Sequence, residues 1–236
     1  MCDQLYFVIE HHDENHGPMP LAWCFELCLD GTSEIGTVPA YYAPQRDPLL
    51  PLGKVSGKLY QWPTSSEFIN MVRTWTEDCV TSHVKCATDM DDTLPERVLD
   101  LGAFDDGETV KLLGTSGRGG RYIALSYCWG EKMPPTTTLH NRAQHEQGIR
   151  LSELPMTYRD AVRVARSLSI RYLWIDSLCI VQDDDGDRER QLGRMAEIFS
   201  KAFLVLICAD ASDPYEGFLH DRPLMYLWSE ATPIQS

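Results

Sequence analysis

This 236-residue sequence is poor in positive charge and has no long apolar segment. Lysine and arginine together number 21 against 35 aspartates and glutamates, which gives a net charge of −14. Nucleic-acid backbones and anionic membrane surfaces attract basic patches, so this balance argues against both as partners. The longest apolar runs, such as residues 203–208, are far too short to span a bilayer. A phosphate-binding loop of the G-x-x-x-x-G-K type is also missing, which argues against phosphoryl transfer.

The N-terminus has neither the basic start nor the small-residue cleavage site of a secretory signal, so we expect a cytoplasmic protein. Several of the eight cysteines lie within apolar runs. In an intracellular setting such residues are buried free thiols rather than disulfides. Hydrophobic residues make up 43% of the chain and charged residues 24%, so it can bury a sizeable core.

Strands and helices alternate in the last part of the chain. The predicted elements are strand 122–128, helix 154–170, strand 172–180, helix 187–202 and strand 203–209. This order is typical of a parallel sheet built from right-handed crossovers. The strands are almost continuously apolar, which indicates burial on both faces. The sequence therefore predicts an α/β fold with a parallel sheet flanked by helices.

The first part of the chain is patterned more weakly. Two further strands are predicted at 97–102 and 109–115, and residues 64–67 have the spacing of a capping box that opens a helix. Residues 1–62 show only short strand-like runs and several prolines. We interpret them as an N-terminal α+β extension.

The helix that begins near residue 66 raises the question of a metal site. Cys79, His83 and Cys86 share one face if the helix continues that far, and three such side chains can bind zinc when a fourth ligand joins them. The same face carries Phe68 and Val72, which are core residues. Core packing and a structural zinc site both remain open.

Polar residues follow the ends of the predicted parallel strands, where ligands bind in open sheets of this kind. One set follows residue 125 and the other follows residue 181. The candidate ligand-binding residues are Ser126, Tyr127, Trp129, Gly130, Gln182, Asp183 and Asp184. A tryptophan offers a stacking surface and a glycine allows close approach of the backbone, which suits a sugar or nucleotide ligand. Residues 183–185 also precede a helix, which one of them can cap.

Asp176 interrupts the apolar run 172–180 and is the one unexplained polar residue in it. A buried carboxylate without partners is costly, so it is either satisfied structurally or used chemically. We keep it as a candidate catalytic residue.

Several long motifs occur in a preserved order: GRYIALSYCWG, then LPMTYRDAVRVARSLSIRYLWIDSLCIVQDD, RERQLGRMAEIFSKA and GFLHDRPL. Together they closely resemble the fungal heterokaryon incompatibility (HET) domain. The segments WTEDCVTSHVKC and LPERVLDLG resemble the region that usually precedes it. The resemblance implies an effector of programmed cell death, acting through self-association or with other incompatibility proteins. It implies no required cofactor.

HET domains are in turn thought to be similar to TIR domains, which have a flavodoxin-like parallel sheet. Some TIR domains cleave NAD at the nicotinamide–ribose bond with a glutamate on a helix, so the resemblance implies NAD as a possible substrate. A carboxylate can stabilise the oxocarbenium-like transition state of such a reaction. This sequence has Gln191 in the usual glutamate position, and Glu189 is the nearest carboxylate that could replace it. The alternative is a non-catalytic self-association module.

From the resemblance we expect three parts: the extension 1–62, a HET-like domain 63–224, and a tail 225–236. The family usually continues beyond this point. The chain can therefore be a truncated member or a short stand-alone domain.

Overall fold

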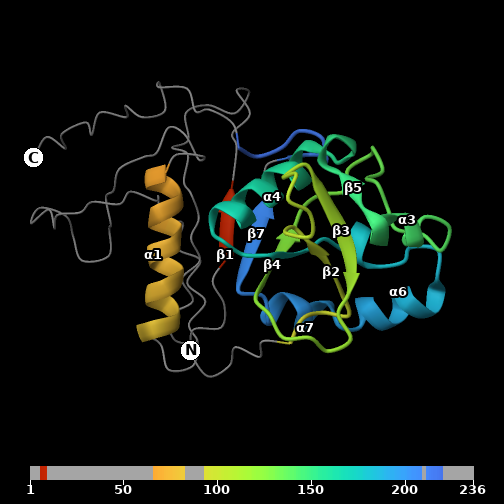
Figure 1. The fold of residues 1–236 in the computed structure, drawn as a ribbon, viewed down its shortest axis with the longest axis horizontal. Coiled ribbons are helices and arrows are strands. Elements are labelled where there is room, and N and C mark those ends of the chain that lie inside the picture. Colours follow the sequence, from red (N-terminus) through yellow and green to blue (C-terminus); the bar gives the residue numbers. More distant parts are fainter. Residues whose placement is uncertain (1–5, 10–65, 83–92, 209–210, 220–236) are drawn as a thin grey trace, which may run out of the picture.

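The computed structural model describes residues 6–9, 66–82, 93–208 and 211–219. They form a mixed α/β fold in which helices flank a single seven-stranded sheet (Figure 1). The sheet order is β1 (Tyr6–Ile9), β7 (Leu204–Cys208), β4 (Tyr122–Ser126), β6 (Tyr172–Trp174), β2 (Arg97–Asp100), β3 (Thr109–Gly114) and β5 (Ile149–Arg150). The predicted α/β class is confirmed.

The sheet has a parallel half and an antiparallel half. Strands β1, β7, β4 and β6 run parallel to their neighbours. Strands β2, β3 and β5 continue the sheet beyond β6 with antiparallel pairing. The all-parallel, flavodoxin-like or TIR-like arrangement is therefore not what these strands form. A short connection, residues 101–108, joins β2 to β3 and permits antiparallel pairing without a crossover helix.

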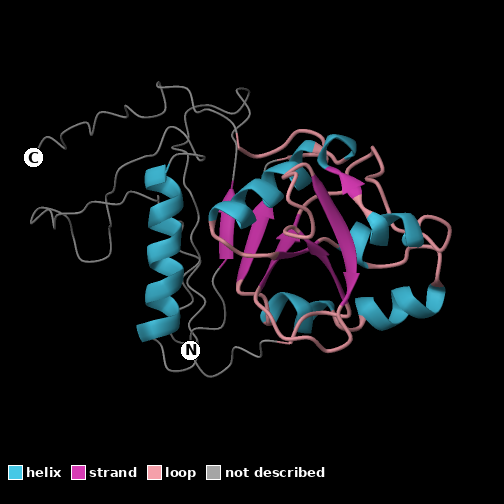
Figure 2. Ribbon diagram, in the orientation of Figure 1, coloured by secondary structure: helices cyan, strands magenta, loops and turns pink. Residues whose placement is uncertain are grey.

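The helices cover the sheet and its ends (Figure 2). They are α1 (Ser66–Ser82), α3 (Arg142–Gln147), α4 (Met156–Ser167), α5 (Asp176–Cys179), α6 (Asp185–Leu192) and α7 (Met195–Ser200), with a 3-10 turn at Leu151–Glu153. Helix α1 lies on the β1 side of the sheet, and α3 and α6 lie on the β5 side (Figure 1).

The core forms where the apolar strands meet the apolar faces of the helices. Ile123 of β4, Leu173 of β6 and Leu204 of β7 are fully buried. Residues 161, 162, 165 and 168 of α4 are buried as its 3.6-residue pattern predicts. The near-continuous burial of these strands confirms that both faces of the sheet are covered.

Two predicted elements differ from the structure. The strand predicted at 172–180 ends at Trp174, and residues 176–179 form the single turn α5. Every residue from Ser177 to Val181 is buried, and an apolar run of this length does not distinguish a strand from a buried helical turn. The single helix predicted at 187–202 is two helices separated at Gly193. The 3.6-residue apolar pattern of this segment predicts a buried stripe through Leu192, Met195 and Phe199, but Leu192 is 53% exposed.

Candidate functional site

The polar segments that follow β4 and β6 meet at Asp176, the first residue of α5. The indole Nε1 of Trp129 donates a hydrogen bond of 2.8 Å to Asp176 Oδ2, and the Ser177 amide donates one of 2.7 Å to Oδ1. The Gln182 side chain donates to the Asp176 carbonyl at 3.2 Å. Trp129 and Gln182 thus lie beside Asp176 at the carboxyl ends of the parallel strands, whereas the sequence pattern placed Asp176 inside a strand.

The segment after β7 joins the same edge through Gly130. This glycine has a φ of +62°, a conformation that side chains other than glycine rarely adopt. A Cβ placed there would lie 2.5 Å from the Ser212 carbonyl oxygen and 2.7 Å from Asp213 Cβ. Gly130 therefore allows the loops after β4 and β7 to pack backbone against backbone, and Lys132 pairs with Asp213 at 3.3 Å beside it.

Burial decides the protonation behaviour of Asp176. Loss of water around the carboxyl raises its pKa, and the hydrogen bonds from Trp129 and the Ser177 amide only partly offset this effect. Asp176 is therefore satisfied structurally, and it also holds its proton more tightly than an exposed aspartate does.

A chain of hydroxyl groups runs beside Asp176. Tyr127 and Tyr158 share a hydrogen bond of 2.5 Å between their hydroxyls, and Tyr158 and Ser177 share one of 2.7 Å. The two rings meet edge to face, with centroids 5.2 Å apart. Burial raises the pKa of both tyrosines, so both are neutral donors. Tyr158 was missed by the sequence reasoning, although it precedes the buried Ala161 of α4 by one helical turn.

The other predicted ligand-binding residues include Asp184 and Asp183, which accept hydrogen bonds from backbone amides, and Ser126, which lies within the sheet. Asp184 caps α6 by accepting a hydrogen bond of 3.0 Å from the Asp187 amide, which confirms the capping interpretation. Asp183 accepts a hydrogen bond of 2.7 Å from the Leu139 amide. Ser126 is half-buried at the end of β4, in register with Ile207 of β7.

Glu189 lies on a different face of α6 from the buried side chains of that helix. Asp187 and Gln191 are 3% and 1% exposed, whereas Glu189, two residues from each, is exposed. Two residues turn an α-helix by about 200°, so Glu189 points away from the protein. The catalytic role of Glu189 stays a prediction.

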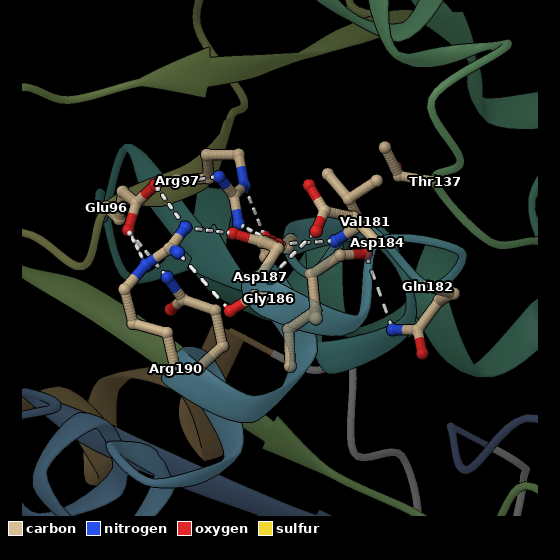
Figure 3. Close-up of polar contacts among 12 residues, drawn as sticks. Glu96, Arg97, Thr137, Val181, Gln182, Asp184, Gly186, Asp187 and Arg190 are labelled. Atoms are coloured by element: carbon tan, nitrogen blue, oxygen red, sulfur yellow. Dashed lines mark hydrogen bonds and ion pairs between the residues drawn. The ribbon is translucent and has the colours of Figure 1, made fainter.

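A cluster of charged side chains, in which Arg97 and Asp187 are buried, occupies the inner face of α6 (Figure 3). The Asp187 carboxylate pairs with Arg97 of β2 and with Arg190, and it also accepts a hydrogen bond of 2.9 Å from the Val181 amide. Burial alone would raise the pKa of Asp187, but the hydrogen bonds and positive charges outweigh it and hold the pKa below its usual value. The cluster holds the first turn of α6 against the first residue of β2.

Gln191 belongs to this cluster. Its Nε2 donates a hydrogen bond of 2.7 Å to Glu96 Oε2, and the side chain is almost fully buried. A glutamate at this position would place a second carboxylate against Glu96. The amide therefore fits the surroundings that β2 provides, where a charged glutamate would be repelled.

Asp160 fixes the segment that follows β7. Its Oδ2 accepts hydrogen bonds from the Phe218 amide at 2.9 Å and the Leu219 amide at 3.1 Å, and the carboxylate is 3% exposed. Gly217, with a φ of +78°, packs against Asp160 and Met156 without room for a Cβ. Helix α4 is thus bound to the GFL part of the GFLHDRPL motif.

The zinc hypothesis is tested only in part. Phe68 and Val72 are buried on α1, as the packing interpretation expects, and Cys79 is half-buried on the same helix. His83 and Cys86 lie outside the described residues. Within the described ranges, no three histidine, cysteine, aspartate or glutamate side chains gather in a metal-binding arrangement. The zinc site stays a prediction.

Comparison with known proteins gives a consistent result. Residues 122–235 match the family model described as "Heterokaryon incompatibility protein (HET)". Among curated proteins, the chain is similar to "Heterokaryon incompatibility protein 6, OR allele" of Neurospora crassa, with 31% identity over 93 residues. That match covers 36% of this chain and 14% of the relative, so the chain aligns with a small part of it. No solved structure matches.

The matched region begins at β4 and includes helix α6 and the segment bound by Asp160. It also includes Trp129, Gly130, Asp176 and Gln182, which we call the Asp176 cluster. The predicted domain limits at residues 63 and 224 stay predictions. In the part of the chain that the structure describes, no helix has the length and apolar character needed to cross a membrane. The resemblance drawn from the motifs is confirmed, because residues 122–235, just under half of the chain, match the HET family model.

Proposed function

We propose that this chain acts in heterokaryon incompatibility as a cell-death effector, and that the Asp176 cluster is its ligand site. The family match and the name of the Neurospora relative support the first part. The convergence of three loops on Trp129, Gly130 and Asp176 supports the second, because ligands of parallel sheets bind where such loops meet. Self-association, or binding to other incompatibility proteins, brings the effector into action in the cytoplasm.

The chemistry proposed for the site is NAD cleavage, in keeping with a distant relation to TIR domains that the parallel strands β7, β4 and β6 support. The bond between the nicotinamide nitrogen and ribose C1′ breaks, and the electron pair leaves with nicotinamide. Water adds to C1′ and releases one proton to the solvent. The ionised carboxylate of Asp176 stabilises the positive charge that develops on the ribose. Trp129 supplies an aromatic surface for the ligand and positions the carboxylate through its indole N–H.

The observation that carries this proposal is the position of Asp176. It lies at the carboxyl ends of the strands and is hydrogen-bonded to a tryptophan from a neighbouring loop. Glu189, the other candidate, is exposed on the outer face of α6. Because burial raises the pKa of Asp176, turnover should rise with pH as this group loses its proton.

The test compares two variants that change the charge but preserve the shape. Purified, concentrated protein is incubated with NAD, and nicotinamide release is followed for the wild type, Asp176→Asn and Glu189→Gln. We expect turnover in the wild type and in Glu189→Gln and none in Asp176→Asn. Turnover that survives in Asp176→Asn and disappears in Glu189→Gln would assign the catalytic role to Glu189 instead.

A second function is favoured by Gln191. In place of a glutamate this chain has an amide, whose hydrogen bond to Glu96 helps to fix α6. A structural role for residue 191, in place of a catalytic one, fits a non-catalytic self-association module. If cell killing is intact and no condition yields nicotinamide, the module is the function and the enzyme proposal fails.

A further inference from the structure

A cavity lies at the opposite end of the parallel strands from Asp176. Its volume is about 580 Å³. Its lining includes Arg121, Arg171 and Phe203, which directly precede β4, β6 and β7 in that order. Helix α1 also lines the cavity, through Arg73 and Glu77. Five residues of extended strand separate the two ends of β4, or about 15 Å, so this cavity is distinct from the Asp176 cluster.

The cavity is basic although the chain carries a net charge of −14. Three arginines and one glutamate line it. Arg171 is neutralised by Asp100, which accepts hydrogen bonds of 2.8 and 2.9 Å from its guanidinium. Arg73 and Arg121 form no ion pair with any carboxylate in the described part of the chain. Two positive charges therefore face one lining glutamate.

The two arginines without an ion pair are held in place by neutral groups. Arg73 donates to the Ser167 carbonyl at 2.7 Å and to Asn70 Oδ1 at 3.1 Å. The Arg121 guanidinium lies over the ring of Phe203, 5.2 Å from its centre. Contacts of this kind orient a guanidinium and leave its charge uncompensated. Arginine in that condition favours phosphate, whose oxygens accept paired hydrogen bonds from the planar fork.

The rest of the lining is suited to an organic ligand rather than to a bare ion. Leu168, Ile170, Tyr172 and Phe203 supply apolar and aromatic surface beside the arginines. A cavity of this volume is within the range of small-molecule sites, about 300–1,000 Å³. A ring of a nucleobase can pack against such surface while a phosphate meets the guanidinium groups.

We propose that this cavity binds a mononucleotide, with its phosphate between Arg73 and Arg121 and its base against the aromatic and apolar lining. The site is separate from the proposed NAD-cleaving cluster and does not depend on that activity. Bound nucleotide would join α1 to the amino ends of β4, β6 and β7, so occupancy would stabilise the contact between this helix and the sheet.

The experiment measures AMP binding to the full chain by isothermal titration calorimetry, with adenosine and inorganic phosphate as partial ligands. The test variant is Arg121→Glu and the matched control is Arg118→Glu, an exposed arginine three residues away that does not line the cavity. We expect Arg121→Glu to weaken AMP binding by about tenfold or more, the loss of a charge-assisted hydrogen bond. Arg118→Glu should leave it unchanged.

Further arms separate this site from others. Asp176→Asn should bind AMP like the wild type, because its change lies at the other end of the sheet. Arg121→Met removes the charge without reversing it and gives the same loss if the Glu variant folds poorly. Adenosine and inorganic phosphate should each bind more weakly than AMP, and AMP binding should weaken between about 50 and 200 mM salt.

Several results of these measurements would overturn the proposal. They are no binding of AMP at millimolar concentration, equal losses in Arg118→Glu and Arg121→Glu, adenosine binding as tightly as AMP, and loss of AMP binding in Asp176→Asn. An acidic peptide that binds where AMP does not would also overturn it, since the arginines would then serve a protein partner.

Discussion

Replacing Asp187 with asparagine tests the charged face of α6 quantitatively. Asp187 and Arg97 are both only 3% exposed at the side chain, so their ion pair is shielded from water. Removing one partner of a buried pair costs about 3–5 kcal/mol, because the other charge remains buried without compensation. Arg97 keeps two neighbours, the Glu96 carboxylate at 2.9 Å and the Cys179 carbonyl at 2.7 Å. We therefore expect a loss near the lower end, about 3 kcal/mol.

Urea denaturation, followed by tryptophan fluorescence and far-ultraviolet circular dichroism, measures this loss. The matched control is Asp185→Asn, because Asp185 lies on the same helix, is 99% exposed and pairs with the exposed Arg188 at 3.4 Å. Its midpoint should stay at the wild-type value. A loss below about 1 kcal/mol in Asp187→Asn would refute the reasoning, since a pair that weak behaves as a surface salt bridge.

The pH dependence of folding stability provides an independent check on the contribution of Asp187. The pKa of Asp187 is lowered in the folded protein, so its contribution to stability is present above the unfolded pKa of about 3.9 and is lost as the pH falls through the folded value. The wild type and Asp187→Asn should therefore differ fully near neutral pH and converge in acid. A difference that persists unchanged down to the acid transition would contradict this assignment.

Three further predictions use the same denaturation assay or hydrogen exchange. Asp176→Asn should abolish the stability that the wild type gains on acidification from neutral pH, because a raised pKa means that the folded state favours the protonated carboxyl; an equal gain in both proteins would contradict it. Gln191→Glu should lower the midpoint at neutral pH and recover near pH 5, as a carboxyl facing Glu96 takes up a proton; a pH-independent effect would point to packing instead. Asp160→Ala should reduce hydrogen-exchange protection of the Phe218 and Leu219 amides and cost about 1–3 kcal/mol for the buried donors left unpaired, and full protection would show that Asp160 does not hold the segment.

The strands of the parallel half were predictable because their residues are apolar on both faces. The runs at β4 and β7 show no alternation, which agrees with strands covered on both sides. What the sequence did not reveal is the partner of each strand. Strands β2 and β3 were predicted, but nothing in their residues shows that β2 pairs antiparallel with β6 and extends the sheet.

The charged face of α6 was not predictable for a related reason. The hydrophobic pattern of residues 187–202 placed Leu192 on the inner stripe, whereas the structure buries Asp187 and Gln191. Polar side chains become inner residues only when partners meet them, and here the partners are Glu96 and Arg97, about ninety residues earlier in the chain. Helical periodicity describes one segment at a time and contains no information about such partners.

The short turn α5 determines whether Asp176 can act as a site residue at all. If β6 continued through the apolar run to Ile180, Asp176 would lie within the sheet, with its carboxyl directed between strands and helices. Because the strand ends at Trp174 and the chain turns at once, Asp176 instead occupies the edge where the loops after β4 and β7 meet. Trp129 can then reach its carboxylate, and Ser177 connects the same turn to the hydroxyls of Tyr158 and Tyr127. The change from strand to turn therefore moves Asp176 from an expected position inside a core strand to the edge of the sheet where we propose the ligand site.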